Sequence, residues 1–256
     1  MSRIAMLGVL VMAMGLYAEA AKADAKGDVQ NAAKKLGEAA SYSWTSTPSM
    51  GGGGGGARFQ PGPTNGKTEK DGYTLLTMTM GENSTEAALK GGKIAVKMQD
   101  GWKSSEELAA AGGGAGGGQP GGQQGGRRGR DPSRRLRNFK APAAEAADLV
   151  EKVKDLKEEG GACSGEMTEE GAKSLLSFGR GGGGAGGGQG PEISGAKGTV
   201  KFWLKDGVLA KYEYNVQGKV KFGDREVDMN RTTVVEIKDV GSTKVEVPED
   251  AKKKLG

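Results

Sequence analysis

The chain has 256 residues, of which 37 are Lys or Arg and 32 are Asp or Glu, so its formal charge is +5. This mild basic excess on a mixed surface is not the composition of a protein that binds polyanions, and it makes a nucleic-acid partner unlikely. The absence of histidine excludes Ser-His-Asp and Cys-His catalysis and every zinc site that uses imidazole. The single cysteine, Cys163, excludes a thiolate metal cage, a CxxC redox pair and an internal disulfide, and we interpret it as a buried small hydrophobe. We therefore expect no metal and no cofactor.

The first 20 residues have the pattern of a secretory signal peptide. Arg3 provides a basic region, residues 4–16 an apolar core, and Ala18-Glu19-Ala20 a cleavage site, with Ala23-Asp24-Ala25 as the alternative. The apolar run is shorter than the roughly 20 residues that a membrane-spanning helix needs. No cysteine lies near the cleavage site to carry a lipid anchor. We expect a soluble exported protein, periplasmic or secreted and monomeric, and an uncleaved membrane anchor is the alternative.

Three glycine-rich segments interrupt the mature chain, at residues 49–57, 112–131 and 179–192. Such segments bury no side chains and behave as flexible, disordered coil. None of them has the spacing of a phosphate-binding loop. No segment between two of them is large and apolar enough to fold alone, so we expect them to be loops inserted into one domain that covers residues 26–256.

The N-terminal half predicts a helix followed by antiparallel hairpins. Residues 28–40 predict a helix with Asp28 as its N-cap, and a strand at 42–45 follows, with Tyr42 and Trp44 on one side. Turn pairs of the Asp-Gly and Gly-Gly type predict two hairpins, 67–70 with 73–80 and 85–89 with 93–98.

The alternation in residues 93–98 places Ala95 on a face that we expect to be solvated. Ser104 or Ser105 can cap a short helix that ends near Leu108.

Helical patterns also follow the second glycine-rich segment. Residues 142–157 predict the longest helix, with Pro142 in its first turn and one apolar stripe. Thr168 is the expected cap of a second short helix, and Pro248 opens a last helical turn. The whole inventory is nine or ten strands with three or four peripheral helices.

The region from 195 to 256 predicts an antiparallel meander, with turns at 206–207, 223–224 and 241–242. A two-residue turn at Asp206-Gly207 leaves no consistent apolar face. A three-residue turn with Gly207 at positive φ pairs Leu204 with Val208 and gives one apolar face, so we prefer it. It places Trp203 and Leu209 together on the outer face.

The inner face of the meander is the predicted ligand-binding surface. Its candidate residues are Phe202, Leu204, Tyr212, Tyr214, Met229, Arg231 and Val235. Arg231 is the one inward charge, and its guanidinium can meet a carbonyl or an anionic head group. The alternative is that this side chain extends to water near the strand end.

A basic segment offers a second candidate surface. Six arginines lie within eleven residues: Arg127, Arg128, Arg130, Arg134, Arg135 and Arg137. In an exported protein they would meet anionic lipid head groups or envelope polymers, or they keep a linker solvated. The carboxylates lie in turns, helix starts or solvated strand faces, so we interpret them as surface groups and expect no catalytic residue.

Two stretches, 200–214 (VKFWLKDGVLAKYEY) and 231–255, resemble the LolA-type lipoprotein-carrier superfamily, which includes related mycobacterial lipid-binding lipoproteins. The layout of the chain also resembles this superfamily: an N-terminal helix is followed by the strand with Trp44, by successive hairpins, by inserted helices and by the meander. The resemblance implies a mainly antiparallel α+β fold: a strongly curved, incompletely closed sheet, or half-barrel, with helices on its concave side and a cavity for acyl chains or other hydrophobic ligands.

Three functions follow from these patterns. The first is a non-catalytic envelope protein that binds a lipid or lipidated partner in an apolar concavity, covered by the helix that begins at Pro142. The second is an interaction or structural protein that presents the arginines to an anionic surface. The third and weakest is an enzyme that uses two close carboxyl groups with raised pKa values.

Overall fold

The computed structural model describes residues 24–51, 61–70, 72–112, 132–177, 192–222 and 225–256. The expected signal peptide and most of the three glycine-rich segments lie outside these residues. No helix of the described chain is long and apolar enough to cross a membrane. The helices are α1 (Ala25–Glu38), α2 (Ser105–Gly112), the short 3-10 helix η2 (Pro132–Arg135), α3 (Pro142–Glu151), α4 (Glu169–Ser177) and α5 (Glu249–Leu255).

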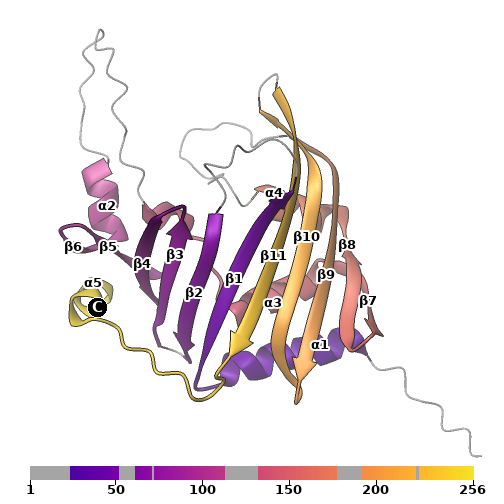
Figure 1. The fold of residues 1–256 in the computed structure, drawn as a ribbon, viewed down its shortest axis with the longest axis horizontal. Helices are drawn as coiled ribbons and strands as arrows, with labels where there is room; N and C mark the ends of the chain where they lie inside the picture. The colour runs from indigo at the N-terminus through magenta and orange to yellow at the C-terminus, as the bar shows by residue number, and fades with distance from the viewer. Residues whose placement is uncertain (1–23, 52–60, 71, 113–131, 178–191, 223–224) are drawn as a thin grey trace, which may run out of the picture.

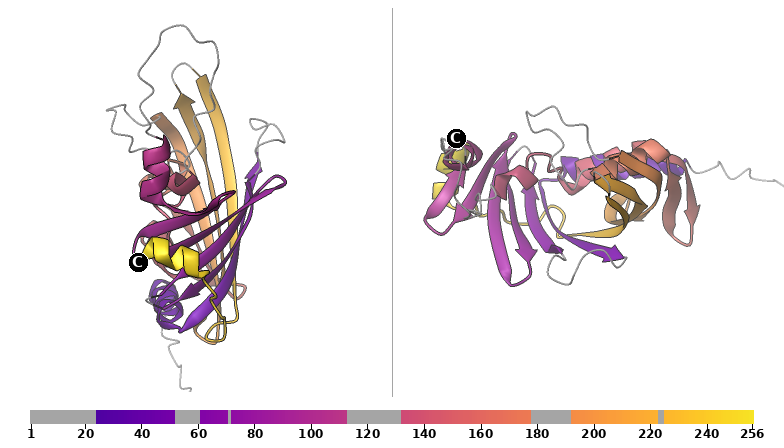
Figure 2. Two further views of the ribbon diagram at one scale, coloured as in Figure 1. Left: turned by 90° about the vertical axis from the view of Figure 1, so that its left-hand side faces the viewer. Right: turned by 90° about the horizontal axis from the view of Figure 1, so that it is seen from above.

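The described strands form one antiparallel sheet of 11 strands (Figure 1). They are β1 (Ser41–Gly51), β2 (Pro61–Glu69), β3 (Thr74–Met80), β4 (Asn83–Lys90), β5 (Lys93–Met98), β6 (Gly101–Ser104), β7 (Val153–Glu159), β8 (Ala162–Met167), β9 (Glu192–Lys205), β10 (Val208–Phe222) and β11 (Arg225–Lys238). The order is β6-β5-β4-β3-β2-β1-β11-β10-β9-β8-β7, so β1 and β11 join the two halves of the chain. Edge strands β6 and β7 do not pair with each other, and the two ends of the sheet lie apart (Figure 2). The predicted curved, incompletely closed sheet is thus confirmed.

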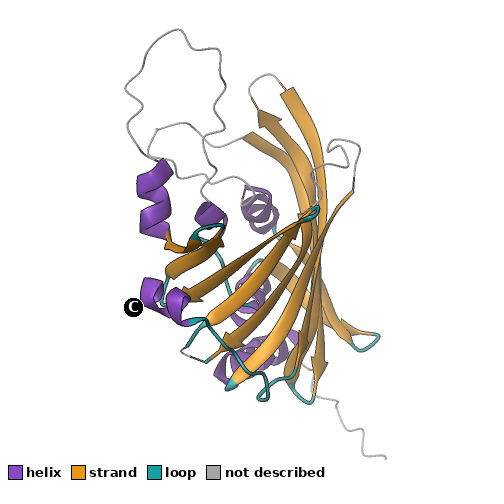
Figure 3. Cartoon of the chain, turned by 60° about the vertical axis from the view of Figure 1, so that its left-hand side comes forward, coloured by secondary structure: helices purple, strands orange, loops and turns teal. Residues whose placement is uncertain are grey.

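Helices α1, α3 and α4 pack on the concave face of the sheet (Figure 3). The apolar face of α1 is buried there through Val29, Ala32, Ala33 and Leu36, as its periodicity predicts. The expected N-cap is wrong by one turn: α1 begins at Ala25, and the Asp28 amide donates to the carbonyl of Asp24. Asp28 is therefore in the first turn, where a negative charge still suits the helix dipole.

Two other predicted caps are confirmed. The Ser104 hydroxyl accepts from the Glu107 amide at 3.2 Å, and the Glu107 carboxylate accepts from the Ser104 amide at 2.8 Å, which is a capping box before α2. The Thr168 hydroxyl accepts from the Gly171 amide at 3.0 Å at the start of α4.

Helix α5 covers the opposite, convex face at the β4–β6 end of the sheet. Ala88, Ala95 and Trp102 pack there against Val247, Ala251 and Leu255. The predicted solvated face of residues 93–98 is therefore wrong at Ala95, which is fully buried. Residues 243–247, which follow the predicted turn at 241–242 and belong to the predicted meander, are not in the sheet and instead lead the chain across to α5.

The predicted helix 142–157 ends early. α3 stops at Glu151, and residues 153–159 form β7 instead. Val153 is paired with Met167 of β8, and the Thr168 amide donates to the Lys152 carbonyl at 2.8 Å. Pairing with β8 satisfies the backbone groups that a longer helix would have used, and Val153 is buried in this strand.

The first hairpin of the meander uses the turn that the sequence analysis rejected. Asp206 and Gly207 both have positive φ, 55° and 70°, and Val208 pairs with Lys205. The register then shifts between Leu209 and Lys211, which is a β-bulge. The extra residue restores the apolar face, because Tyr212 pairs with Phe202 and Tyr214 with Val200. Leu209 is consequently buried in the main core rather than lying with Trp203 on the outer face.

Candidate functional site

The concave face is not filled completely by its helices. A cavity of about 250 Å³, the Trp44 cavity, lies between strands β1–β3, β10 and β11 and the segment 135–145. Its lining residues are Trp44, Ser46, Thr64, Leu76, Met78, Arg135, Leu136, Asn138, Phe139, Lys140, Pro142, Glu145, Tyr212 and Val235. Apolar and aromatic side chains form most of the wall, and the two cations, Arg135 and Lys140, lie at the end of η2 and in the segment that follows it.

Three contacts fix the position of Trp44. Its indole Nε1 donates to Thr68 Oγ1 at 3.1 Å, and its ring stacks on Phe139 with centroids 5.8 Å apart. The ring also lies across Gly66, its neighbour on β2, so closely that a β-carbon at Gly66 would overlap the indole. Gly66 therefore makes room for one wall of the cavity.

Gly66→Ala is expected to lower the free energy of unfolding by about 1–3 kcal/mol, because the added methyl displaces a buried indole. Urea unfolding followed by tryptophan fluorescence measures the effect. The matched control is Gly37→Ala, since a β-carbon there makes only an ordinary 3.6 Å contact and alanine favours the helix. Equal stability of Gly66→Ala and wild type would contradict this packing.

A buried carboxyl group borders the cavity. Glu145 of α3 accepts a short hydrogen bond from the Tyr212 hydroxyl and a second from the Tyr214 hydroxyl at 3.2 Å. Tyr212 is fully buried and Tyr214 nearly so. Burial raises the pKa of Glu145, against the lowering effect of the two tyrosines and of the nearby Arg231 charge. Burial also raises the pKa of both tyrosines, and the neighbouring Glu145 adds to that shift.

Arg231 points inward, as its strand parity predicts. Its Nη2 donates to the carbonyl of Leu175, in the last turn of α4, at 2.8 Å. The buried Nε has no hydrogen-bond partner among the described residues. The guanidinium thus stabilises the C-terminal end of a helix that covers the sheet.

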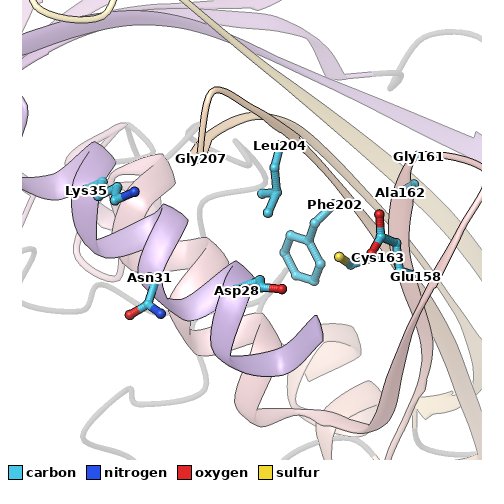
Figure 4. Close-up of a pocket in the computed structure, with 10 residues that line it drawn as sticks. All are labelled: Asp28, Asn31, Lys35, Glu158, Gly161, Ala162, Cys163, Phe202, Leu204 and Gly207. Carbon is cyan, nitrogen blue, oxygen red and sulfur yellow. The ribbon is translucent and has the colours of Figure 1, made fainter. Parts of the chain in front are cut away.

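A second cavity, the Phe202 cavity, has a volume of about 350 Å³ and lies between α1 and strands β7–β9 (Figure 4). Its lining residues are Asp28, Asn31, Lys35, Glu158, Gly161, Ala162, Cys163, Phe202, Leu204 and Gly207. Cys163 is buried, as expected, and burial, with Glu158 and Asp28 nearby, raises the pKa of its thiol. The charged rim makes this cavity more polar than the Trp44 cavity. A third cavity of about 430 Å³ lies at Tyr42, between α1, α3 and the ends of β1 and β2.

The predicted ligand-binding residues are divided between these cavities. Tyr212 and Val235 line the Trp44 cavity, whereas Phe202 and Leu204 line the Phe202 cavity. Tyr214, Met229 and Arg231 line none of the three cavities. Phe202, Tyr212, Tyr214 and Val235 are almost fully buried beneath the helices, and Leu204, Met229 and Arg231 are partly buried. Much of the predicted inner face is therefore packed core.

Sequence reasoning missed the residues that shape the Trp44 cavity, namely Trp44, Leu76, Phe139 and Glu145. One signal for Glu145 was available, because it lies four residues before Leu149 and so shares the apolar stripe of α3. The interpretation of all carboxylates as surface groups is wrong for Glu145.

Three of the six arginines can be placed. Arg127, Arg128 and Arg130 lie outside the described residues, and Arg134, Arg135 and Arg137 are exposed in and just after η2. Arg135 contacts the Met80 sulfur and lines the Trp44 cavity.

Two classes of chemistry find no support in the part of the chain that the structure describes. No group of three Cys, Asp or Glu side chains there is placed to hold a metal ion. Near Glu145, Asp148 is the other acidic group; partial burial acts to raise its pKa, but hydrogen bonds from Lys152 and Lys140 lower it overall. The pKa values of this pair therefore shift in opposite directions, so the pair is not the two close carboxyl groups with raised pKa values that the third functional hypothesis named.

Comparisons with known proteins gave matches only among solved structures; no family model and no curated protein matches the chain. The fold is similar to LprF from Mycobacterium bovis, with a TM-score of 0.42, 11% identity, and coverage of 88% of this chain and 95% of that one. It is similar to the Mycobacterium tuberculosis lipoprotein LppX, with a TM-score of 0.42, 10% identity, and coverage of 88% and 98%. A LolA-superfamily protein from Nitrosomonas europaea gives 0.34 and 9%, with coverage of 91% and 97%. The resemblance expected from the sequence is confirmed as a weak one.

Proposed function

We propose that this protein is an exported, non-catalytic envelope protein that binds a hydrophobic ligand on the concave face of its curved sheet. The observation that carries the proposal is the Trp44 cavity, where the side chains of Trp44, Leu76, Met78, Phe139 and Val235 line a space that α1, α3 and α4 leave on that face. An apolar cavity with a few convergent polar groups is the usual form of a small-molecule site.

The site is rigid on one side and adaptable on the other. Trp44 and Leu76 are buried in the sheet, whereas Met78 and Phe139 are only partly buried. Phe139 lies in the irregular segment between η2 and α3 and is held by its stack on Trp44. An irregular segment can move without breaking the sheet, which would let a ligand enter.

Native mass spectrometry of the mature protein from its own envelope, with solvent extraction, is expected to find a copurified apolar ligand. Met78→Trp fills the cavity and should reduce the binding of an acyl-chain probe at least about tenfold, because the indole occupies the space of the chain. Thr77→Trp, next to it on β3 and facing the other way, is the control and should bind as wild type does. A protein without copurified lipid that binds no acyl probe would reject the proposal.

The second candidate is an interaction protein whose basic segment meets an anionic surface. The exposed Arg134, Arg135 and Arg137 favour it. It stays a prediction, because half of the arginine cluster lies outside the described residues.

A further inference from the structure

The mouth of the Trp44 cavity is positively charged. Residues 132–140 contain four cations and no carboxylate. Arg135 and Lys140 of this segment line the cavity together with Phe139. A ligand that enters beside Phe139 therefore passes two cationic side chains.

The charge of Arg135 is not neutralised by the described residues. Its only hydrogen bond there runs from Nη1 to the Met80 sulfur, which is a weak, neutral acceptor. Lys140, in contrast, lies 3.1 Å from a carboxylate oxygen of Asp148. Of the two cations that line the cavity, Arg135 is thus the one without a carboxylate partner among the described residues. A guanidinium binds carboxylate and phosphate groups in a bidentate manner.

The interior of the cavity suits an uncharged chain. Trp44, Leu76 and Val235 form apolar walls, and the Glu145 carboxyl already accepts hydrogen bonds from two tyrosines. An anionic group placed beside the Glu145 carboxyl would lose its hydration without gaining a partner. The volume of about 250 Å³ lies below the usual range of roughly 300–1,000 Å³ for drug-sized ligands, which favours one chain over several.

We infer that the Trp44 cavity selects a single-chain amphiphile with an anionic head group, a carboxylate or a phosphate, which binds Arg135 while the chain lies against Trp44 and Met78. This inference rests on the proposed function and adds the ligand class and the specificity-determining residue. The shared chemistry is the anion; its source is either a free fatty acid or a phosphorylated lipid.

The test is calorimetric titration of the mature protein with decanoate and decyl phosphate, each below its micelle concentration, and with decanol below its solubility limit. At least one anion is expected to bind about tenfold or more tightly than decanol, with an affinity that falls as salt is added. Preference for decanoate would indicate the fatty acid and preference for decyl phosphate the phosphorylated lipid.

Variants of the basic segment assign the head-group contact. Arg135→Gln should abolish the preference for the anion, so that the anions no longer bind more tightly than decanol, and Arg135→Lys should keep part of the preference. Arg134→Gln, an exposed neighbour that does not line the cavity, is the control and should retain it. Because Arg135 is exposed, its replacement is not expected to impair folding.

The outcomes separate the inference from the proposed function. Equal binding of decanol and both anions by wild type overturns the inference and leaves hydrophobic-ligand binding intact. A preference that survives in Arg135→Gln overturns the role of Arg135. Failure of all three probes to bind overturns both proposals.

Discussion

Phe202→Ala is expected to lower the free energy of unfolding by about 3–5 kcal/mol. The ring is completely buried, packs on Tyr212 with centroids 6.2 Å apart, and lies beneath α1 next to Cys163. Removing it enlarges the Phe202 cavity, and the surrounding strands are held by pairing on both sides and cannot collapse into the space. Urea unfolding followed by circular dichroism measures the change.

Trp203→Ala is the matched control for Phe202→Ala. Trp203 is the next residue of β9, points to the opposite face and is partly exposed, with the Lys211 ammonium 4.7 Å from its ring centroid. Its loss is expected to cost about 1 kcal/mol. Similar effects of the two substitutions would show that the inner face at Phe202 is not the core of the fold.

Glu145→Ala is expected to cost about 1–3 kcal/mol for each tyrosine hydroxyl that loses its acceptor. Tyr212 is the more sensitive of the two, because its side chain is fully buried and water cannot replace the carboxylate. Glu145→Gln should cost much less, since the amide can accept from one tyrosine and donate to the other. Urea unfolding of both variants measures the difference, and equal losses would contradict the hydrogen-bonded arrangement.

Glu145→Gln should also change the dependence of stability on pH. Burial raises the folded-state pKa of Glu145 above the ordinary value of 4.5. Its favourable contribution is therefore fully present below the unfolded-state pKa and is lost as the pH rises through the folded-state pKa. Relative to wild type, Glu145→Gln should gain stability from about pH 4 upward until the folded-state carboxyl is fully ionised.

Unfolding free energies measured from acid to neutral pH test this sign. The groups that face Glu145 are Tyr212 and Tyr214 on β10, Arg231 on β11 and Asp148 on α3. Glu213→Gln, between the two tyrosines but on the opposite face, controls for the loss of a negative charge. A difference between Glu145→Gln and wild type that does not vary with pH would contradict the raised pKa.

The arrangement of the concave face explains how one sheet can be both a stable core and a binding surface. The central strands are covered by α1, α3 and α4, so most of the predicted ligand-binding residues stabilise the fold. The Trp44 cavity lies beside the segment through which the chain enters α3. We therefore expect ligand specificity to depend on the segment 135–145 more than on the meander.

The sequence by itself determined the hairpins β2–β3 and β4–β5, the strands of the meander, most turns and the apolar face of α1. These features depend on residues close together in the chain: a Gly-rich turn, an alternation of period two, or a helical stripe. The absence of histidine and the single cysteine likewise followed from the sequence directly, and they excluded histidine-dependent catalysis, thiolate metal sites and an internal disulfide.

The tertiary structure alone decided the end of α3, the bulge after Leu209 and the burial of Ala95 beneath α5. It also brought Glu145 to two tyrosines 67 and 69 residues away, and Trp44 to Phe139. Each of these depends on backbone or side-chain groups that meet only when distant segments pair. Local periodicity shows which residues share a face of a helix or strand. Only the packing of distant segments shows which group each buried side chain contacts and where space for a ligand remains.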